Sequence, residues 1–252
     1  MSENTPFPAE YEPPAGLLRD RVVLVTGAGQ GLGKAVALEA AKSGATVALL
    51  GRKQEKLEST YDAITAAGGA EPAMIPLDLA AAGNAEYEAL AQLLRKDLKR
   101  LDGIVHCAAH FVPLSPLANQ TIEQWTALMK VNLTAPFALT RACLPLLQAA
   151  PDSSVVFVGE THGAAPLAYW GGFAVAKSAL STLAAIWAQE LEHKGKPRMN
   201  VFIPGPIATP QRMQSHPGEN QERLRTAASA ARALLYLVGP AGAGFNGRTV
   251  GL

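Results

Sequence analysis

RVVLVTGAGQGLG, residues 21–33 of the chain, joins an apolar run to a glycine-rich turn with the spacing T-G-x-x-x-G-x-G, and a helical stretch follows. Glycines let such a turn be tight and let its backbone approach a pyrophosphate, while the start of the helix supplies N–H groups and a positive dipole end. A plain structural turn is the alternative, but the position directly after a first strand favours a dinucleotide phosphate loop. The loop residues predicted to contact the cofactor are Gly27, Gln30, Gly31, Leu32 and Gly33.

Short apolar runs alternate with longer helical stretches along the rest of the chain. Runs without polar alternation indicate strands buried on both faces, hence a parallel sheet, and the β-α alternation indicates right-handed crossovers. We therefore predict an α/β fold with one Rossmann-type doubly wound parallel sheet in a three-layer α/β/α sandwich, spanning residues 21–252. The predicted strands are Arg21–Thr26, Thr46–Leu50, Ala73–Leu77, Leu101–Cys107, Ser154–Val158, Met199–Ile203 and a last one near Arg248–Leu252.

Helical spacing and breaker residues place the helices between these strands. Asn84 is the expected N-cap of the third helix, and Pro136 and Pro145 are expected to bend or break the fourth. The predicted helices are Gly33–Ser43, Gln54–Ala67, Asn84–Arg100, Thr121–Ala150, Gly171–His193 and Glu219–Val238.

Composition excludes several classes of protein. The formal net charge of +1 gives no support to a nucleic-acid or membrane partner, and the longest apolar runs are taken as strand-sized. Two cysteines make no disulfide framework, which favours a cytoplasmic location. Residues 1–20 are rich in proline and acids and lack a signal-type apolar run. They are an extended N-terminal arm, for which a disordered tail is favoured over an arm lying along the domain.

The end of the second strand bears on the choice of cofactor. An acidic residue that binds the ribose 2′-hydroxyl belongs about 20 residues after the loop, but Gly51 and Arg52 stand there. Because an arginine pairs with a 2′-phosphate, NADP is favoured and NAD remains possible. Arg52 as a solvated charge at a helix start is the alternative, and the neutral Gln30 adds no second cation to the loop.

Six landmarks in the same order identify a family resemblance. The cofactor loop is the first, Asp78-Leu79 after the third strand is the second, and the strand of Leu101 to Val105 is the third. Val131-Asn132, A-x-x-K-x-A around Lys177, and PGPIxT from Pro204 complete the set. The chain resembles the short-chain dehydrogenase/reductase family from about Leu18 onward, and some of its short sequence motifs are similar to those of the bacterial YciK-type branch. The resemblance implies further cofactor contacts at Asp78, Leu79, Cys107, Ala108, Ala109, Lys177, Pro204, Gly205, Ile207 and Thr209.

Two catalytic positions of that family carry other residues. Four residues before Lys177, where the family has its proton-donor tyrosine, stands Phe173, and the family's serine is replaced by Glu160. Of the usual Asn-Ser-Tyr-Lys set, Asn132 and Lys177 remain. Phe173 cannot exchange a proton, and an ionised Glu160 repels a developing oxyanion. The chain is therefore either an NADP-linked oxidoreductase with an altered proton-transfer group or a cofactor-binding pseudoenzyme that serves as a sensor or interaction subunit. A structural protein that no longer binds nucleotide is a third, weaker reading, which the retained loop opposes.

Further candidates surround these positions. Glu160 is expected to pair with Lys177, unless it turns to solvent. Tyr169 either reaches the cleft as a substitute phenol or packs at its lip, and Glu160 with His162 is a possible new acid/base pair. His106, Cys107 and His110 lack a fourth ligand, so we predict no metal there and a role in lining the nicotinamide pocket.

The resemblance also implies a lid and an assembly. The polar segment after Thr209 would be a short lid over an open or shallow site, with Trp170 and Met213 flanking a small carbonyl or alcohol substrate. The helices of residues 121–150 and 171–193 would form the interface of a homodimer or homotetramer.

Overall fold

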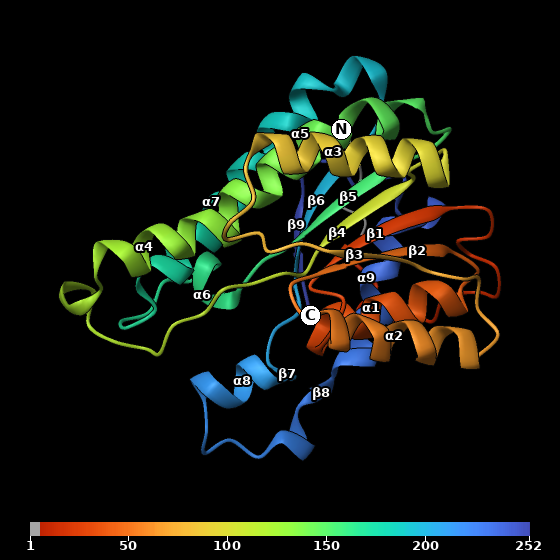
Figure 1. The fold of residues 1–252 in the computed structure, drawn as a ribbon. Helices are drawn as coiled ribbons and strands as arrows, with labels where there is room; N and C mark the ends of the chain where they lie inside the picture. Colours follow the sequence, from red (N-terminus) through yellow and green to blue (C-terminus); the bar gives the residue numbers. More distant parts are fainter. Residues whose placement is uncertain (1–5) are drawn as a thin grey trace.

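A computed structural model describes residues 6–252 and has one large parallel sheet at its centre (Figure 1). Its seven strands stand in the order β3-β2-β1-β4-β5-β6-β9, and every neighbouring pair is parallel. This order reverses direction between β1 and β4, which is the topological switch point where such sheets bind nucleotides. The strands are β1 (Val22–Thr26), β2 (Thr46–Gly51), β3 (Ala73–Pro76), β4 (Gly103–His106), β5 (Ser154–Val158), β6 (Arg198–Ile203) and β9 (Thr249–Gly251).

Helices cover both faces of the sheet and confirm the predicted doubly wound α/β/α sandwich. In Figure 1, α1, α2 and α9 lie on one side of the strands, and α3, α5 and α7 lie on the other. The helices are α1 (Gly31–Lys42), α2 (Gln54–Ala66), α3 (Asn84–Leu93), α4 (Ile122–Met129), α5 (Ala135–Ala149), α6 (Thr161–Ala164), α7 (Gly171–Glu190), α8 (Pro210–Ser215) and α9 (Ala227–Val238). Short 3-10 turns add η2 (Leu117–Asn119), η4 (Glu192–Lys194), η5 (Gln221–Arg223) and η6 (Pro240–Gly242).

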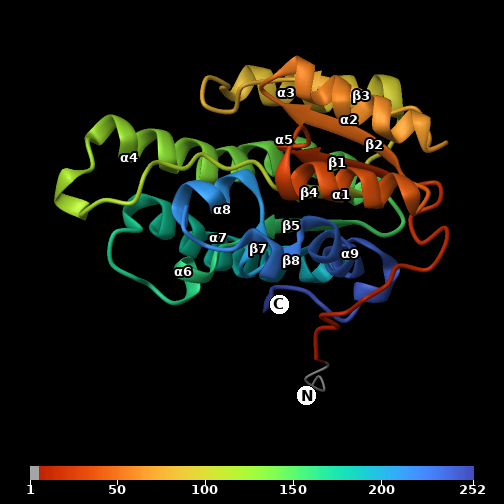
Figure 2. The ribbon, with the colours of Figure 1, turned by 90° about the horizontal axis from the view of Figure 1, so that it is seen from below.

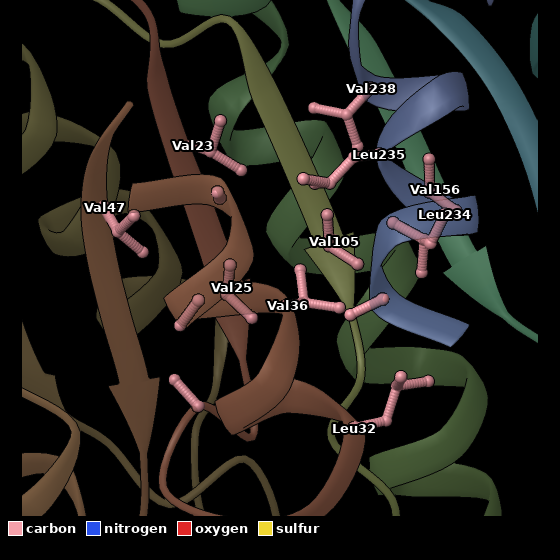
Figure 3. Packing of buried hydrophobic residues seen from close by; sticks show 14 of the residues in the cluster. Val23, Val25, Leu32, Val36, Val47, Val105, Val156, Leu234, Leu235 and Val238 are labelled. Carbon is pink, nitrogen blue, oxygen red and sulfur yellow. The ribbon is translucent and has the colours of Figure 1, made fainter. Parts of the chain in front are cut away.

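Two hydrophobic cores follow from the side-chain alternation of the strands. Because successive residues point to opposite faces, Val23 and Val25 of β1 face one core while Val22 and Leu24 face the other. All five residues of β1 are buried, which explains its unbroken apolar run. Figure 3 shows the first core, where valines of four neighbouring strands meet side chains of α1 and α9, among them Leu32, Val36, Leu234, Leu235 and Val238.

Several predicted helix boundaries are wrong. Gly83, not Asn84, is the N-cap of α3, and the Glu86 carboxylate accepts the Gly83 N–H at 2.7 Å. Pro145 lies inside α5 without breaking it, and the irregularity of this region is a π-helical segment, η3 (Lys130–Thr134), just before Pro136. A second π segment, η1 (Leu94–Leu98), ends α3.

The last predicted helix begins eight residues later than Glu219, at Ala227. The chain between is taken up by η5 and by β8 (Arg225–Thr226), which pairs in parallel with β7 (Ile207–Ala208). Two-residue strands carry no periodicity, so the sequence could not indicate them. This small sheet ties the segment after β6, which carries α8, to the start of α9 (Figure 1).

The N-terminal arm lies along the domain rather than away from it, as far as residues 6–20 are described; residues 1–5 lie outside the described residues. Figure 2 shows it running beside α9. The Phe7 ring packs edge-on against Phe202, Tyr236 and Phe245, with centroids 5.8–6.2 Å apart. Carboxylates of the arm pair with arginines in the middle of α9 and in β8, Glu12 with Arg232 and Glu10 with Arg225, both at 2.8 Å.

One helix, α7, is long and apolar enough to cross a membrane by length and composition alone, so the expectation of strand-sized apolar runs was wrong. Half of its apolar window is buried inside the fold. Leu180, Ala184 and Trp187 of α7 belong to the core on the second face of the sheet. The apolar character of α7 therefore has a sufficient cause in the packing of the domain.

Candidate active site

A cavity of about 420 Å³ opens at the carboxyl ends of β1, β2, β4, β5 and β6. It follows the switch point of the sheet, where a dinucleotide is expected to lie. Every residue predicted from the sequence to contact the cofactor lines it: Gly27, Gln30, Gly31, Leu32, Gly33, Arg52, Asp78, Leu79, Cys107, Ala108, Ala109, Lys177, Pro204, Gly205, Ile207 and Thr209.

Two glycines of the loop lie so close to neighbouring backbone that they leave no space for a side chain. A Cβ on Gly33 would lie 2.3 Å from the Gly27 carbonyl oxygen, and one on Gly27 would lie 2.9 Å from the Ala108 backbone. Gly27 and Gly31 also have φ of +68° and +55°, a region that side chains disfavour. The first turn of α1 starts at Gly31, so its free N–H groups face the cavity. The loop therefore fits a pyrophosphate at the helix start.

Basic side chains gather at the end of this cavity beyond β2. Arg52, Lys53 and Lys56 all line it, and Lys56 donates a hydrogen bond to the Gln30 side-chain oxygen. From the sequence only Arg52 was predicted as a cation of this region, and the two lysines were missed. Lys56 comes from the first turn of α2, and its reach back to the loop becomes visible only once the two elements are packed together. This cluster suits a phosphate at the 2′ position.

Asp78 follows β3 and lines the cavity at the same end. Its Oδ1 accepts the Ala80 N–H at 3.0 Å, which closes a tight turn after the strand. Leu79 beside it is buried in the second core. The turn therefore holds Asp78 at the carboxyl edge of the sheet.

The end of β4 forms the floor of the cavity. Thr26 of β1 accepts the Ala108 N–H at 3.0 Å and holds the strand end in place. His106 is buried, stacks on Phe157 and shares a hydrogen bond of 2.9 Å with Thr140. Burial lowers the pKa of His106 to about 3 and raises that of the Cys107 thiol to about 12. Both groups are uncharged at neutral pH, so they bring no charge to this part of the site. Cys107 and His110 line the cavity as predicted, whereas His106 is buried behind it and does not, so the prediction is wrong for His106.

Asn132 lies behind this floor, in the π segment η3. Its side-chain amide donates to the carbonyl oxygens of His110 and Leu128, and its Oδ1 accepts the His110 N–H at 3.1 Å. Asn132 does not line the cavity. It acts as a positioning residue, because it fixes the backbone at His110 where the chain leaves β4.

Lys177 projects from α7 into the cavity and is buried. Its Nζ donates to the Val158 carbonyl oxygen at 2.8 Å and lies 5.8 Å from the Phe173 ring centroid. Burial lowers the pKa of Lys177 to about 8, against the opposing charge of Glu160. The prediction that Lys177 pairs with Glu160 is wrong, because within residues 6–252 no contact within 4.0 Å joins the two side chains.

Glu160 and Phe173 both line the cavity at the positions predicted. Glu160 follows β5 as the N-cap of α6, and Phe173 is 1% exposed in the first turn of α7. The Phe173 ring lies edge-on to Phe111 at 5.2 Å, and Trp170 stands 6.1 Å from both rings. Aromatic side chains therefore occupy the region in which a hydroxyl group was expected.

Tyr169 is not a substitute for the missing phenol. It is 58% exposed, has φ of +77° and does not line the cavity. His162 lies against Trp170, with ring centroids 4.2 Å apart, and within residues 6–252 it shares no hydrogen bond with Glu160. Neither of the two proposed rescues of proton transfer is assembled in this structure.

The segment predicted to form a lid contains the helix α8 and the loop that follows it. Arg212 and Glu219 form a two-pronged ion pair at 2.6 and 2.7 Å, which closes this loop on itself. Arg212, Gln214 and Ser215 line the cavity, whereas Met213 is 56% exposed and points away from it. The expectation that Met213 flanks the substrate is therefore wrong, and the lid presents polar groups instead.

Comparison with known proteins agrees with this geometry. A family model described as short chain dehydrogenase matches residues 21–220. The chain belongs to the short-chain dehydrogenase/reductase family. It is 36% identical over 229 residues to YciK of Escherichia coli K12, an uncharacterised oxidoreductase, covering 91% of this chain and 90% of that protein.

Solved structures of similar proteins have the same fold. A short chain dehydrogenase from Pseudomonas syringae superposes with a TM-score of 0.93 at 38% identity, covering 96% of this chain and 98% of the other. A Shigella flexneri short chain dehydrogenase complexed with NADP gives a TM-score of 0.91 at 34% identity, covering 94% and 99%. One from Escherichia coli CFT073 complexed with NADPH also gives 0.91, at 35% identity and the same coverage. The YciK-type resemblance predicted from the sequence is confirmed.

Proposed function

We propose that this protein is an NADP-dependent short-chain oxidoreductase that transfers hydride to or from a small substrate by a route without a tyrosine acid. The observation that carries the proposal is the cavity itself, which joins a glycine cradle, a basic cluster and a buried lysine in one continuous space. NADP over NAD is supported by Arg52, Lys53 and Lys56, which line the cavity just after Gly51, near the place where NAD-dependent folds have an acidic residue. Two similar proteins were solved with NADP and NADPH.

Different residues of the chain would bind different parts of the cofactor. The glycine loop and the α1 N-terminus would hold the pyrophosphate, and the basic cluster would hold the 2′-phosphate. Lys177 would bind the nicotinamide ribose from the buried side, where Val158 fixes its Nζ. When bound, NADPH supplies the hydride. Phe173 provides no proton, so a ketone would be reduced about 10²–10⁴-fold more slowly than with a positioned acid.

A second candidate function is a cofactor-binding pseudoenzyme that acts as a sensor or interaction subunit. Phe173 and Glu160 favour it, since a carboxylate replaces an oxyanion-stabilising hydroxyl and a phenyl ring replaces the acid. Measured turnover of any defined substrate with NADPH would exclude this alternative.

Calorimetric titration with NADPH and, separately, with NADH tests the main proposal. Tight NADPH binding with weak NADH binding is expected from the phosphate loop and the basic cluster. If neither dinucleotide binds, the oxidoreductase proposal fails, and a scaffold without cofactor takes its place.

We further propose that the chain forms a homodimer or homotetramer through the faces of α5 and α7. Phe137, Val175 and Ile186 leave 39–48% of their surfaces exposed on these helices. Analytical ultracentrifugation tests this, and a monomer at micromolar concentration would contradict it. A cytoplasmic location is proposed because Cys107 and Cys143 are free thiols.

A further inference from the structure

The part of the cavity next to Lys177 has aromatic walls. Phe111, Trp170 and Phe173 all line it, from the segment after β4 and from the start of α7. Phe111 and Phe173 meet at 89°, and Trp170 is tilted by 39° to Phe173 and 59° to Phe111. An aromatic ring carries negative potential on its face, so a cavity lined by three rings is a favourable environment for an organic cation.

The Glu160 carboxylate lines the same space without a partner of its own. Within residues 6–252 it takes part in no side-chain hydrogen bond and no ion pair. Neither of the two nearby cations lies within 4.0 Å of Glu160: Arg212 is paired with Glu219, and the Lys177 Nζ donates to the Val158 carbonyl oxygen. Burial also lowers the pKa of Lys177 to about 8, which weakens its opposition to a cationic ligand. The acceptor oxygens of Glu160 are therefore left for a ligand.

A carboxylate at this place changes which hydride acceptor is stabilised. Reduction of a carbonyl places negative charge on oxygen, which Glu160 would repel and which Phe173 cannot neutralise with a proton. Reduction of an iminium ion has the opposite electrostatics, because a positive charge is present before the transfer and is lost during it. A carboxylate and aromatic faces both bind such a cation.

We propose that the substrate of this site is an organic cation with a C=N⁺ bond, held by Glu160 and by the aromatic wall of Phe111, Trp170 and Phe173. Hydride from NADPH forms a C–H bond at the iminium carbon, and the C=N π pair becomes the lone pair of the amine nitrogen. The substrate gains two electrons, NADPH is oxidised to NADP, and no proton is transferred in the step. The absence of a tyrosine acid therefore does not slow this reaction.

This inference rests on the proposed NADP-dependent function, and the experiment separates the two. The probes are an N-methyl dihydroisoquinolinium salt and tetralone, an uncharged ketone of similar bicyclic shape. Binding of each is measured by calorimetry with the unreactive tetrahydro form of NADPH present, and again on the cofactor-free protein. The proteins compared are the parent, Glu160→Gln and a control, Glu192→Gln, whose side chain is exposed in η4, just after α7 and outside the cavity.

The cation is expected to bind at least about tenfold more tightly than tetralone. Glu160→Gln should reduce cation affinity by about tenfold and change tetralone affinity little, and Glu192→Gln should change neither. With NADPH, the parent should reduce the iminium salt, and Phe173→Tyr should not accelerate that reduction. Equal affinity for the two probes, or unchanged cation binding in Glu160→Gln, would overturn the inference. Failure of the tetrahydro cofactor to bind would instead overturn the proposed function, while the cofactor-free titration still tests the cation site.

Discussion

The Nζ of Lys177 lies 5.8 Å from the centre of the Phe173 ring, one helical turn away on α7. The family resemblance predicts a tyrosine and a lysine at these two positions, and Phe173 differs from that tyrosine by the missing hydroxyl group. Both are buried in the same cavity, and Val158 holds the lysine from the β5 side. The cavity therefore holds a buried amine beside a phenyl ring that cannot exchange a proton.

Restoring the missing groups should create carbonyl reduction. In the double variant Phe173→Tyr with Glu160→Ser, the new phenol would lie beside Lys177, whose charge favours phenolate formation. We expect the rate of NADPH-dependent reduction of a small ketone or aldehyde to rise about 10²–10⁴-fold over the parent. Steady-state consumption of NADPH, followed by absorbance, measures this. Phe173→Tyr alone is the matched control and should gain less, since Glu160 still opposes the oxyanion.

Cofactor choice should depend on the basic cluster beyond β2. Arg52→Ala and Lys56→Ala each remove a cation from the place expected for the 2′-phosphate, so NADPH affinity should fall about tenfold or more while NADH affinity changes little. Titration of the two dinucleotides against each variant measures the selectivity. Lys42→Ala, an exposed lysine at the far end of α1, should leave both affinities unchanged. Equal losses for NADPH and NADH would place the 2′-phosphate elsewhere.

The burial of Lys177 predicts a pH-dependent stability. Its pKa falls from 10.5 to about 8 on folding, so between pH 8 and 10.5 the unfolded chain binds more protons than the folded one. The folded state is therefore penalised by up to about 3 kcal/mol below pH 8, and the penalty fades as pH rises to 10.5. The Cys107 and Cys143 thiols act in the opposite direction, because burial raises their pKa from 9.0 to about 12 and the unfolded chain therefore loses these protons first as pH rises above about 9. A variant of Lys177 that keeps both thiols cancels their contribution.

Urea unfolding of the parent and of Lys177→Met from pH 7 to pH 10 tests this expectation. The stability of the parent relative to the variant should improve as pH rises, because only the parent carries the buried ammonium group. A difference between the two proteins that does not vary with pH would show that the Lys177 pKa is not lowered in the fold.

Sequence reasoning succeeded where the information is local. The strand of Val22 to Thr26 and the loop after it are set by apolar residues and glycines in one continuous stretch, and the structure places them as predicted. Family landmarks located Phe173 in the cavity because counting back from Lys177 along α7 preserves register, and Glu160 because it follows the carboxyl end of β5.

Sequence reasoning failed where a side chain chooses between partners that only packing brings close. Lys177 donates to the Val158 carbonyl oxygen instead of pairing with Glu160, because β5 presents that oxygen at 2.8 Å. Lys56 reaches Gln30 across 26 residues of sequence. Asn132 holds the backbone at His110 from a π segment that no residue pattern indicated.

The glycine cradle gives the sharpest structural prediction. In Gly33→Ala the new methyl group would stand 2.3 Å from the Gly27 carbonyl oxygen, which belongs to backbone and cannot move aside as a flexible side chain would. We expect a loss of about 1–3 kcal/mol in the free energy of unfolding and a large loss of NADPH affinity, because the loop must open to relieve the contact. Gly218→Ala is the control, since a Cβ there meets nothing within 4 Å. Urea unfolding and NADPH titration of both variants give the comparison, and parental NADPH affinity in Gly33→Ala would mean that the pyrophosphate does not lie in this loop.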